Sequence, residues 1–214
     1  MKRGISMTIA IALIALWGTA GSPVRADDSP DVAFAKRMFV DNVSKPKAYA
    51  CFVRRYDTEH MKQHPLQKVT VMKLLITSEK TPDDKYLDYS FRLGVNFHDR
   101  PGNFDSSGEC GHAPGVRALN QDTDLPVVTG IDFNCNVDCD GGGIAVDLAK
   151  DNGSVIVKLE DRIRIWKNKD PDEAAVTALK GGADDKMFRL DRTSLNECTA
   201  LVTDRKELAA MRHK

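Results

Sequence analysis

The sequence predicts a mainly β protein, an antiparallel meander of about eight strands that closes fully or nearly into a barrel and carries a short helix near each end. Two observations lead to this class. Apolar residues recur at every second position in many segments, as they do in half-buried strands. Turn residues such as Gly, Pro, Asn and Asp separate most of these segments. A β-sandwich is the alternative, because closure into a barrel depends on whether the first and last strands pair.

The N-terminal residues 1–26 have the pattern of a secretion signal. Lys2 and Arg3 precede an apolar run at 7–17, and small residues follow it up to the expected cleavage point. This run is too short to cross a bilayer, which takes about 20 apolar residues. We therefore expect residues 27–214 to form a single β-rich domain, periplasmic or secreted, with no transmembrane segment after the signal is removed.

The charge of the exported part is close to balanced. Removing the signal takes away three of the 31 basic residues and none of the 31 acidic ones, which leaves 28 against 31 and a net charge of −3. A general nucleic-acid-binding protein normally carries a basic face. The composition therefore argues against nucleic acid as a partner.

A helix is expected at the start of the domain. Ser29 can cap it, Pro30 suits its first turn, and Phe34 and Met38 lie four residues apart on one side of it. The helix should end before Pro46.

Four strands are expected next. Residues 87–97 show the clearest alternation of apolar and polar side chains. Residues 48–57 and 67–78 are also predicted strands, with a polar turn at 58–65 between them. A change of the apolar face within 67–78 indicates a bulge or burial on both sides. Residues 103–112 are predicted to form the fourth strand.

The central stretch 131–147 permits two incompatible interpretations. As a strand, it points Phe133, Cys135 and Cys139 to one face and the intervening Asn and Asp residues to the other. As a loop, it places oxygen ligands and a glycine where a calcium-binding loop has them. Those candidate calcium ligands are Asn136, Asp138, Asp140 and Asp147.

The pairing of the stretch with itself favours the strand. If Gly141 and Gly142 form a two-residue turn, Cys139 faces Ile144 and Cys135 faces Leu148, so every inward pair is apolar. We therefore interpret the stretch as a hairpin whose acidic residues are solvated. No cofactor is expected, and calcium is the alternative that the acids leave open.

The remaining elements follow the same signals. A turn at 151–153 leads into a long strand at 154–166. Two adjacent glycines end a helix expected at 171–180. A short strand at 187–192 and an amphipathic helix at 204–213 complete the chain.

The cysteines suggest disulfide bonds, because export places them where such bonds persist. Cys135 and Cys139 would lie about 13 Å apart along a strand, too far to bond each other. Cys110 is the candidate partner nearest to them in sequence. An odd number leaves one thiol unpaired or bonded between chains. The candidates are Cys51, Cys110, Cys135, Cys139 and Cys198.

Two histidines are the candidate zinc ligands. His60 and His64 have the spacing that brings two imidazoles to one helix face. The segment lacks the glutamate that a zinc protease places beside its first histidine, and Pro65 disfavours a helix there. We therefore interpret both as surface histidines of a loop. Cys110 could act as a nucleophile with His112 as its base, but a disulfide is the favoured interpretation in an exported protein.

These observations favour a protein that binds without catalysis. The expected function is that of an exported, disulfide-stabilised β-barrel that binds an unknown small molecule or an envelope protein. One alternative is a secreted hydrolase or metal-dependent enzyme that uses the His and Asp residues. Another is a structural envelope protein whose interior holds no pocket. A lined cavity would favour a binding protein. A cluster of histidines and carboxylates would favour an enzyme, and a filled interior would favour a structural protein.

Overall fold

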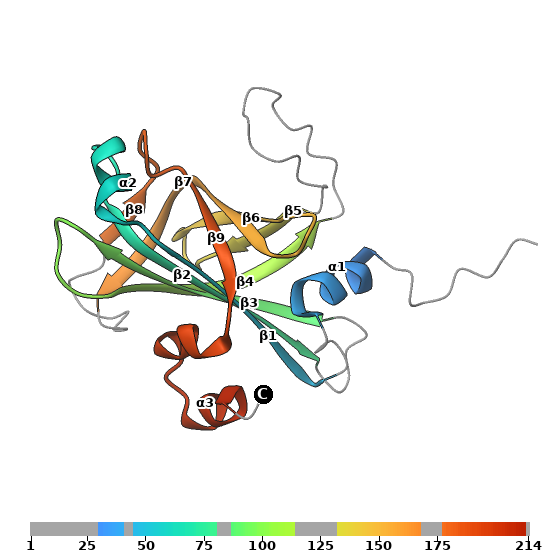
Figure 1. The fold of residues 1–214 in the computed structure, drawn as a ribbon. Helices are drawn as coiled ribbons and strands as arrows, with labels where there is room; N and C mark the ends of the chain where they lie inside the picture. Colours follow the sequence, from blue (N-terminus) through green and yellow to red (C-terminus); the bar gives the residue numbers. More distant parts are fainter. Residues whose placement is uncertain (1–29, 41–44, 81–86, 114–131, 168–176, 213–214) are drawn as a thin grey trace, which may run out of the picture.

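The computed structural model describes residues 30–40, 45–80, 87–113, 132–167 and 177–212 (Figure 1). The expected signal lies outside these residues. The helical elements are α1 (Pro30–Phe39), α2 (Thr58–Gln63), the 3-10 helix η3 (Leu195–Leu201) and α3 (Arg205–Arg212). The strands are β1 (Lys47–Arg55), β2 (Val69–Lys80), β3 (Leu87–Phe97), β4 (Phe104–Ala113), β5 (Asp132–Asn136), β6 (Gly142–Leu148), β7 (Ser154–Lys167), β8 (Thr177–Lys180) and β9 (Met187–Thr193). None of the described helices is long and apolar enough to cross a membrane.

The nine described strands form one antiparallel sheet whose hydrogen bonding runs round a ring. The order β6-β5-β4-β3-β2-β1-β9-β7 returns to its start because β7 also pairs with β6. β1 and β9, the first and last strands, meet over a short stretch in which Cys51 lies opposite Thr193. The predicted mainly β, antiparallel class is therefore confirmed, and this closure is what separates it from the alternative of two stacked sheets.

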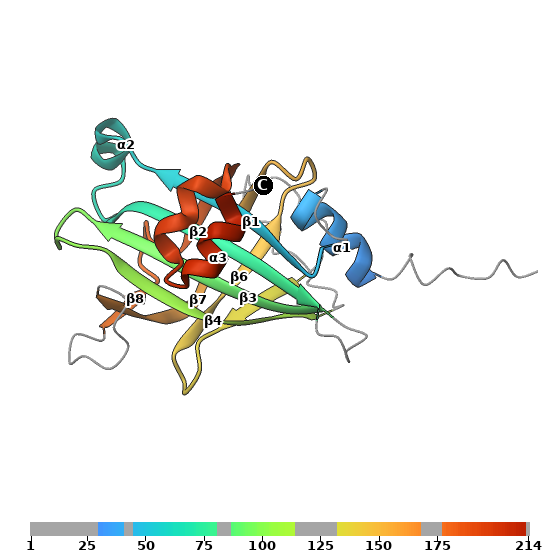
Figure 2. The same cartoon turned by 90° about the horizontal axis from the view of Figure 1, so that it is seen from below.

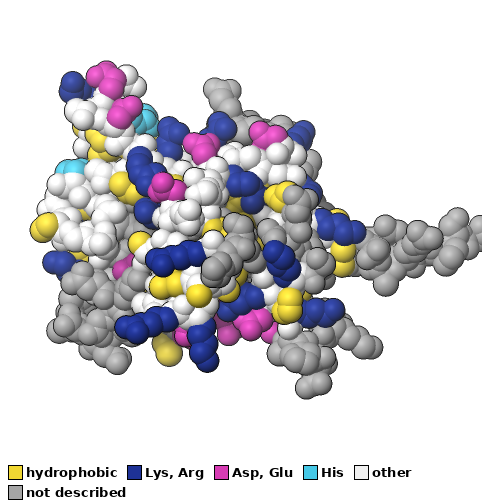
Figure 3. Space-filling model, turned by 60° about the horizontal axis from the view of Figure 1, so that its bottom comes forward, with side chains coloured by type: hydrophobic (Ala, Val, Ile, Leu, Met, Phe, Trp, Pro, Cys, Tyr) yellow, Lys and Arg dark blue, Asp and Glu magenta, His cyan; other side chains and the backbone are white. Residues whose placement is uncertain are grey.

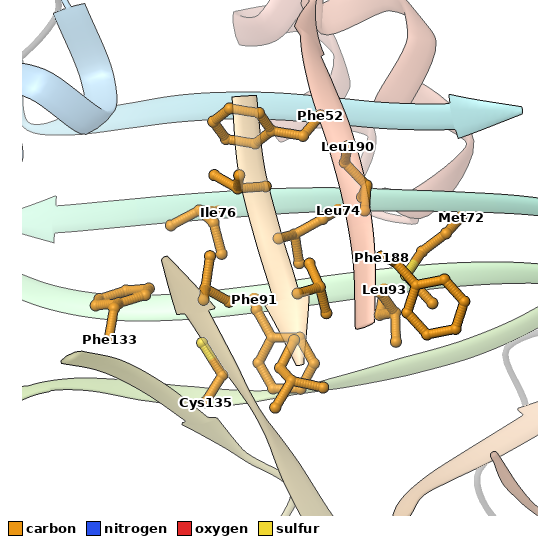
Figure 4. Packing of buried hydrophobic residues seen from close by; sticks show 14 of the residues in the cluster. Phe52, Met72, Leu74, Ile76, Phe91, Leu93, Phe133, Cys135, Phe188 and Leu190 are labelled. Carbon is orange, nitrogen blue, oxygen red and sulfur yellow. The ribbon is translucent and has the colours of Figure 1, made fainter. Parts of the chain in front are cut away.

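The interior of the ring is filled by apolar side chains (Figure 4). Alternate residues of β3 illustrate the cause: Phe91, Leu93 and Val95 point inward and are at most 1% exposed, while the residues between them point out. Phe133 and Phe188 contribute further large buried rings. The strands predicted from two-residue alternation therefore share one core.

Helix α1 covers one end of the ring. The ring of Phe34 lies 4.9 Å from that of Phe133 and 6.0 Å from that of Tyr89, measured between centroids. Arg192 of β9 donates a hydrogen bond from Nη1 to the Met38 carbonyl oxygen at 2.9 Å. The apolar side predicted for this helix is thus the side that packs onto the strand ends.

The C-terminal segment, η3 and α3, lies across the outer face of β1, β2 and β3 (Figure 2). This covering makes a second, smaller core outside the ring. Its buried residues are Tyr49, Cys51, Val53, Leu75, Cys198, Leu201, Val202 and Met211. Because β2 is buried on both faces here, Leu74, Leu75 and Ile76 are all fully buried, which explains the change of face in its sequence.

Two predicted elements differ in type from the structure. The predicted turn at 58–65 contains helix α2, because Asp57 caps it by accepting a hydrogen bond from the His60 backbone N–H at 2.8 Å. The predicted helix at 171–180 is wrong at its described end. There, β8 pairs Leu179 with Ile163 of β7 and buries Leu179, and this pairing outweighs the local helix signal.

The hairpin exists, but its predicted register is wrong by four positions. Cys135 faces Ile144 instead of Leu148, and the Val137 N–H donates to the Gly142 carbonyl oxygen at 3.0 Å. The turn therefore falls on Cys139 and Asp140. Gly142 and Gly143 lie in β6, where the carbonyl oxygens of Arg162 and Cys135 approach too closely for any side chain. A shift by an even number keeps the alternation, so Phe133, Cys135 and Val137 still point inward.

Candidate functional site

The expected disulfide bonds are present. Cys51 of β1 is bonded to Cys198 of η3, and Cys110 of β4 is bonded to Cys135 of β5. Cys139 is the unbonded cysteine and is exposed at the tip of the β5–β6 turn, not inward as the predicted register required. The bond of Cys110 removes the thiol that a nucleophile would need.

The four candidate calcium ligands are spread over the hairpin. Asp138 and Asp140 lie in its turn, Asn136 pairs with Gly143 across the hairpin, and Asp147 lies opposite Ile156 of β7. Across the described ranges, no three His, Cys, Asp or Glu side chains are grouped as a metal site requires.

The two candidate zinc ligands do come together, but by stacking. The rings of Tyr56, His60 and His64 form a stack, with centroids 4.5 Å and 4.3 Å apart. Stacked imidazoles present ring faces to each other, whereas metal ions bind the nitrogen atoms at the ring edge. His60 Nε2 is also 3.0 Å from Gln67 Oε1. These contacts pack the three side chains together at the end of the ring of strands that lies away from α1.

Burial is the largest cause of a shift in the pKa of Tyr56, the tyrosine of this stack. It raises the pKa of Tyr56 to about 12, Asp185 and Asp191 add to the rise, and Arg54 opposes it. Tyr56 is therefore neutral at any physiological pH and cannot act there as a base.

A groove of about 470 Å³ lies between α3 and the beginning of β1. It is bounded on one side by the outward-facing residues of the first strand and on the other by the first turns of α3. Its lining residues are Lys45, Pro46, Lys47, Tyr49, Asp204, Lys206, Glu207 and Ala210. Because it combines this volume with several charged side chains, we take the groove as the candidate site.

Glu207 fixes α3 to the sheet at the floor of this groove. Its carboxylate accepts hydrogen bonds from Arg92 Nη1 at 3.1 Å and Nη2 at 2.9 Å, and forms an ion pair with Lys47 Nζ at 3.4 Å. Burial alone would raise the pKa of Glu207, but the hydrogen bonds and charge of Arg92, with the help of Lys47, outweigh it and hold that pKa below its ordinary value. Burial and the neighbouring Glu207 raise the pKa of Tyr49, which hydrogen bonds to the same carboxylate.

Asp204 is also committed to structure. Its Oδ1 accepts a hydrogen bond from the Glu207 backbone N–H at 2.7 Å and so caps α3. This bond holds the pKa of Asp204 below its ordinary value. Both carboxylates of the groove therefore stay ionised at neutral pH, and each already accepts hydrogen bonds from the protein.

Lys47 is paired with Glu79 and Glu207, but the other two lysines of the groove form no such ion pair with the described residues. Lys45 and Lys206 line the groove, and neither forms an ion pair with any described residue. Arg205 and Arg212 are exposed on the same helix and likewise have no acidic partner in the described part of the chain. We call Lys45, Arg205, Lys206 and Arg212 the basic face. Lys and Arg side chains are spread over the side of the molecule on which α3 lies (Figure 3).

The sequence contained a partial signal for this face. The predicted helix at 204–213 has Leu208 and Met211 on one side and Arg205 and Lys206 on the other. Nothing local linked that helix to Lys45, which is far away in sequence.

No protein-family model matches this chain, and neither a curated protein nor a solved structure shows significant similarity to it.

Proposed function

We propose that this is an exported protein that binds a phosphate-bearing partner, without catalysis, through the groove and the basic face around α3. The observation that carries the proposal is that Lys45 and Lys206 line the groove without ion pairs to described residues, while its two carboxylates are held by α3, Arg92 and Lys47. Export is supported by the signal-like pattern of residues 1–26 and by the two disulfides, which persist in oxidising compartments.

The chemistry of the basic face suits phosphate better than a singly charged group. A phosphate monoester carries a charge of about −1.5 to −2 at neutral pH and offers three strong acceptor oxygens. Lysines supply point charges and arginines supply forked donors for such a group. Two lysines that line one groove, with two exposed arginines on the helix beside it, therefore match a partner with more than one negative charge.

The alternative of catalysis finds less support. His60 and His64 stack against Tyr56, no carboxylates of the described residues are grouped with them, and Cys110 is oxidised. A structural role in the cell envelope is the second candidate, because the interior of the ring is filled by side chains.

The test compares charge-reversed variants with the unaltered protein. Binding to inorganic pyrophosphate is measured by calorimetry, and binding to vesicles of phosphatidylglycerol with phosphatidylcholine by co-sedimentation. We expect the double variant Lys45→Glu, Lys206→Glu to lose binding, and the affinity of the unaltered protein to fall as salt rises. Acidic residues are favourable in the first turn of a helix, so Lys206→Glu should leave α3 folded.

A matched control carries the same change of net charge elsewhere. Lys150 and Lys186 are exposed and form no ion pair with a described residue, so Lys150→Glu, Lys186→Glu should bind as the unaltered protein does. Pyrophosphate binding alone would indicate a soluble ligand, and vesicle binding alone a lipid headgroup. Absence of both, or equal loss in the two double variants, would sink the proposal and favour the structural role.

A further inference from the structure

We propose that the partner of the basic face is a lipid bilayer that contains anionic phospholipids, and that α3 lies along its surface. The inference rests on the proposed function, because it names the molecule that bears the phosphate. Helix α3 packs on the outside of the sheet, where a flat surface can reach it (Figures 1 and 2). Lys and Arg side chains cover this side of the molecule, with hydrophobic side chains between them (Figure 3).

The residues of α3 divide into an inner and an outer side. Glu207, Leu208 and Met211 are buried or half-buried and face the sheet. The remaining residues are exposed and, at 3.6 residues per turn, lie together on the opposite side of the helix. This outer side consists of Arg205, Lys206, Ala209, Ala210 and Arg212. It carries three cations, no acidic residue and no bulky apolar side chain.

The spacing along the outer side suits a surface better than a single soluble phosphate. Arg205 and Arg212 are seven positions apart, which is about 10 Å along a helix. Ala209, which lies between them on this side, is too small to hold a flat partner away. A bilayer presents many separate phosphates in one plane, so both arginines can engage it at once. One soluble phosphate group can use only part of this side of the helix.

Positive charge is gathered where α3 lies. The groove, α3 and the residues that form ion pairs with them contain six cations and three carboxylates, a net charge of +3, whereas residues 27–214 carry −3 in total. The cations are Lys45, Lys47, Arg92, Arg205, Lys206 and Arg212, and the carboxylates are Glu79, Asp204 and Glu207. Anionic lipids attract such a concentration of Lys and Arg.

The groove beside α3 adds room for one lipid headgroup. Lys45 and Lys206 supply charge to its lining, and Pro46, Tyr49 and Ala210 supply apolar surface. A phospholipid headgroup joins a phosphate to the apolar part of the same molecule, so it matches both kinds of lining. One headgroup can therefore enter the groove while its neighbours in the bilayer meet the outer side of α3.

The first test removes charge from α3 outside the groove. Co-sedimentation compares vesicles of phosphatidylcholine alone with vesicles of phosphatidylcholine and phosphatidylglycerol. We expect binding to the anionic vesicles only, and less of it as salt rises. Each cation near such a surface strengthens binding about fivefold, so Arg205→Gln, Arg212→Gln should bind about 25-fold more weakly. The matched control Lys150→Gln, Lys186→Gln changes exposed lysines elsewhere and should bind as the unaltered protein does.

The second test adds a membrane anchor. Tryptophan is favourable at the level of lipid headgroups. Ala209→Trp places an indole on the outer side of α3, so it should tighten binding to the anionic vesicles about tenfold and shift the tryptophan fluorescence to the blue. Ala183→Trp, at an exposed position outside α3 and the groove, should do neither. Ala209 does not line the groove, so Ala209→Trp should leave pyrophosphate binding unchanged.

The outcomes separate this inference from the proposed function. Binding of pyrophosphate without binding of anionic vesicles would leave the phosphate site in place and show the inference to be wrong. Equal binding to vesicles with and without phosphatidylglycerol would also overturn it, as would full affinity in Arg205→Gln, Arg212→Gln protein whose circular dichroism shows it folded. Failure to bind either probe would contradict the proposed function as well.

Discussion

Cys139 and Asp140 form the tip of the β5–β6 turn with backbone φ angles of 56° and 59°. Two successive left-handed residues give the twist that a tight hairpin needs, but this conformation costs a residue with a side chain about 1–2 kcal/mol. Aspartate tolerates it better than most residues, because its short side chain can bond to the local backbone. The turn is thus strained at the place where the chain has an exposed thiol.

Asp140→Gly is expected to stabilise the protein by about 1 kcal/mol, since glycine adopts this φ without the steric penalty. Urea denaturation at neutral pH measures the change. Asp138→Gly is the matched control: this residue has no positive φ, so glycine there should be neutral or destabilising. A loss of stability in Asp140→Gly equal to that in the control would contradict the assigned turn.

The unreduced, denatured protein is expected to react with one equivalent of a thiol-reactive dye, because four of the five cysteines are bonded. Cys139→Ser should react with none and keep its stability within about 0.5 kcal/mol, as exposed substitutions usually do. Mass spectrometry of unreduced peptides identifies the bonded pairs. More than one reactive thiol would show that a bond is missing.

Helix α3 is held to the rest of the protein by two side chains, Met211 and Glu207. It has eight residues, too few to be stable alone in water, so its packing must hold it in place. Met211 supplies the apolar part of that packing, and Glu207 supplies the polar part through Arg92, Lys47 and Tyr49.

Glu207→Gln is expected to lower the free energy of unfolding by about 1–3 kcal/mol near neutral pH, because Arg92 and Lys47 lose a charged partner. The pKa of Glu207 lies below its ordinary value in the folded protein. The contribution of Glu207 to the free energy of unfolding is therefore fully present above the ordinary glutamate pKa of about 4.3. It is lost as the pH falls through the lower pKa that Glu207 has in the folded protein. Denaturation across this range should show the variant and the unaltered protein converging in acid.

The control for this prediction is Glu79→Gln. Glu79 pairs with the same Lys47 but is 58% exposed, so its loss should cost at most about 0.5 kcal/mol. Equal effects of the two variants would mean that Glu207 is not the anchor of α3.

Elements set by local patterns could be predicted from the sequence, whereas those set by pairing with distant segments could not. The strands at 87–97 and 154–166 were predicted nearly to their ends because alternation is a local pattern. β8 was missed because pairing with β7, not its own four residues, makes it a strand. The hairpin turn was misplaced because Gly142, which resembles a turn residue in the sequence, is required for close backbone approach inside the sheet.

The candidate sites were harder to predict. Lys45 and Lys206 become neighbours only through the docking of α3 against the beginning of β1. The histidine spacing was visible in the sequence, but the stacking that occupies those rings was not.

For the molecule as a whole, the two disulfides close loops of very different length. Cys51–Cys198 spans 147 positions and joins the ring to the C-terminal segment, whereas Cys110–Cys135 spans 25 and joins neighbouring strands. Both cross-links lower the conformational entropy of the unfolded chain, and the one that closes the longer loop lowers it more.

Replacing Cys51 and Cys198 by Ala is expected to destabilise the protein by about 1.5 kcal/mol more than replacing Cys110 and Cys135, from the logarithm of the ratio of loop lengths. Each pair should contribute about 2–5 kcal/mol in total. Thermal and urea denaturation of the two double variants measure both quantities. The reverse order of stability would show that local packing at Cys110 and Cys135 outweighs the entropy of the longer loop.

The closure of the ring through β1 and β9 also determines when the protein can fold. A chain made or threaded across a membrane from its N-terminus delivers β1 early and β9 almost last, so the seam between them stays open until nearly every residue has emerged. Until then one edge of β1 is unpaired. Cys51 cannot form its disulfide until Cys198, 147 positions later, has been made, whereas Cys110 and Cys135 can bond earlier. The ring therefore closes late in synthesis, and until then the unpaired edge of β1 is open to pairing with other chains.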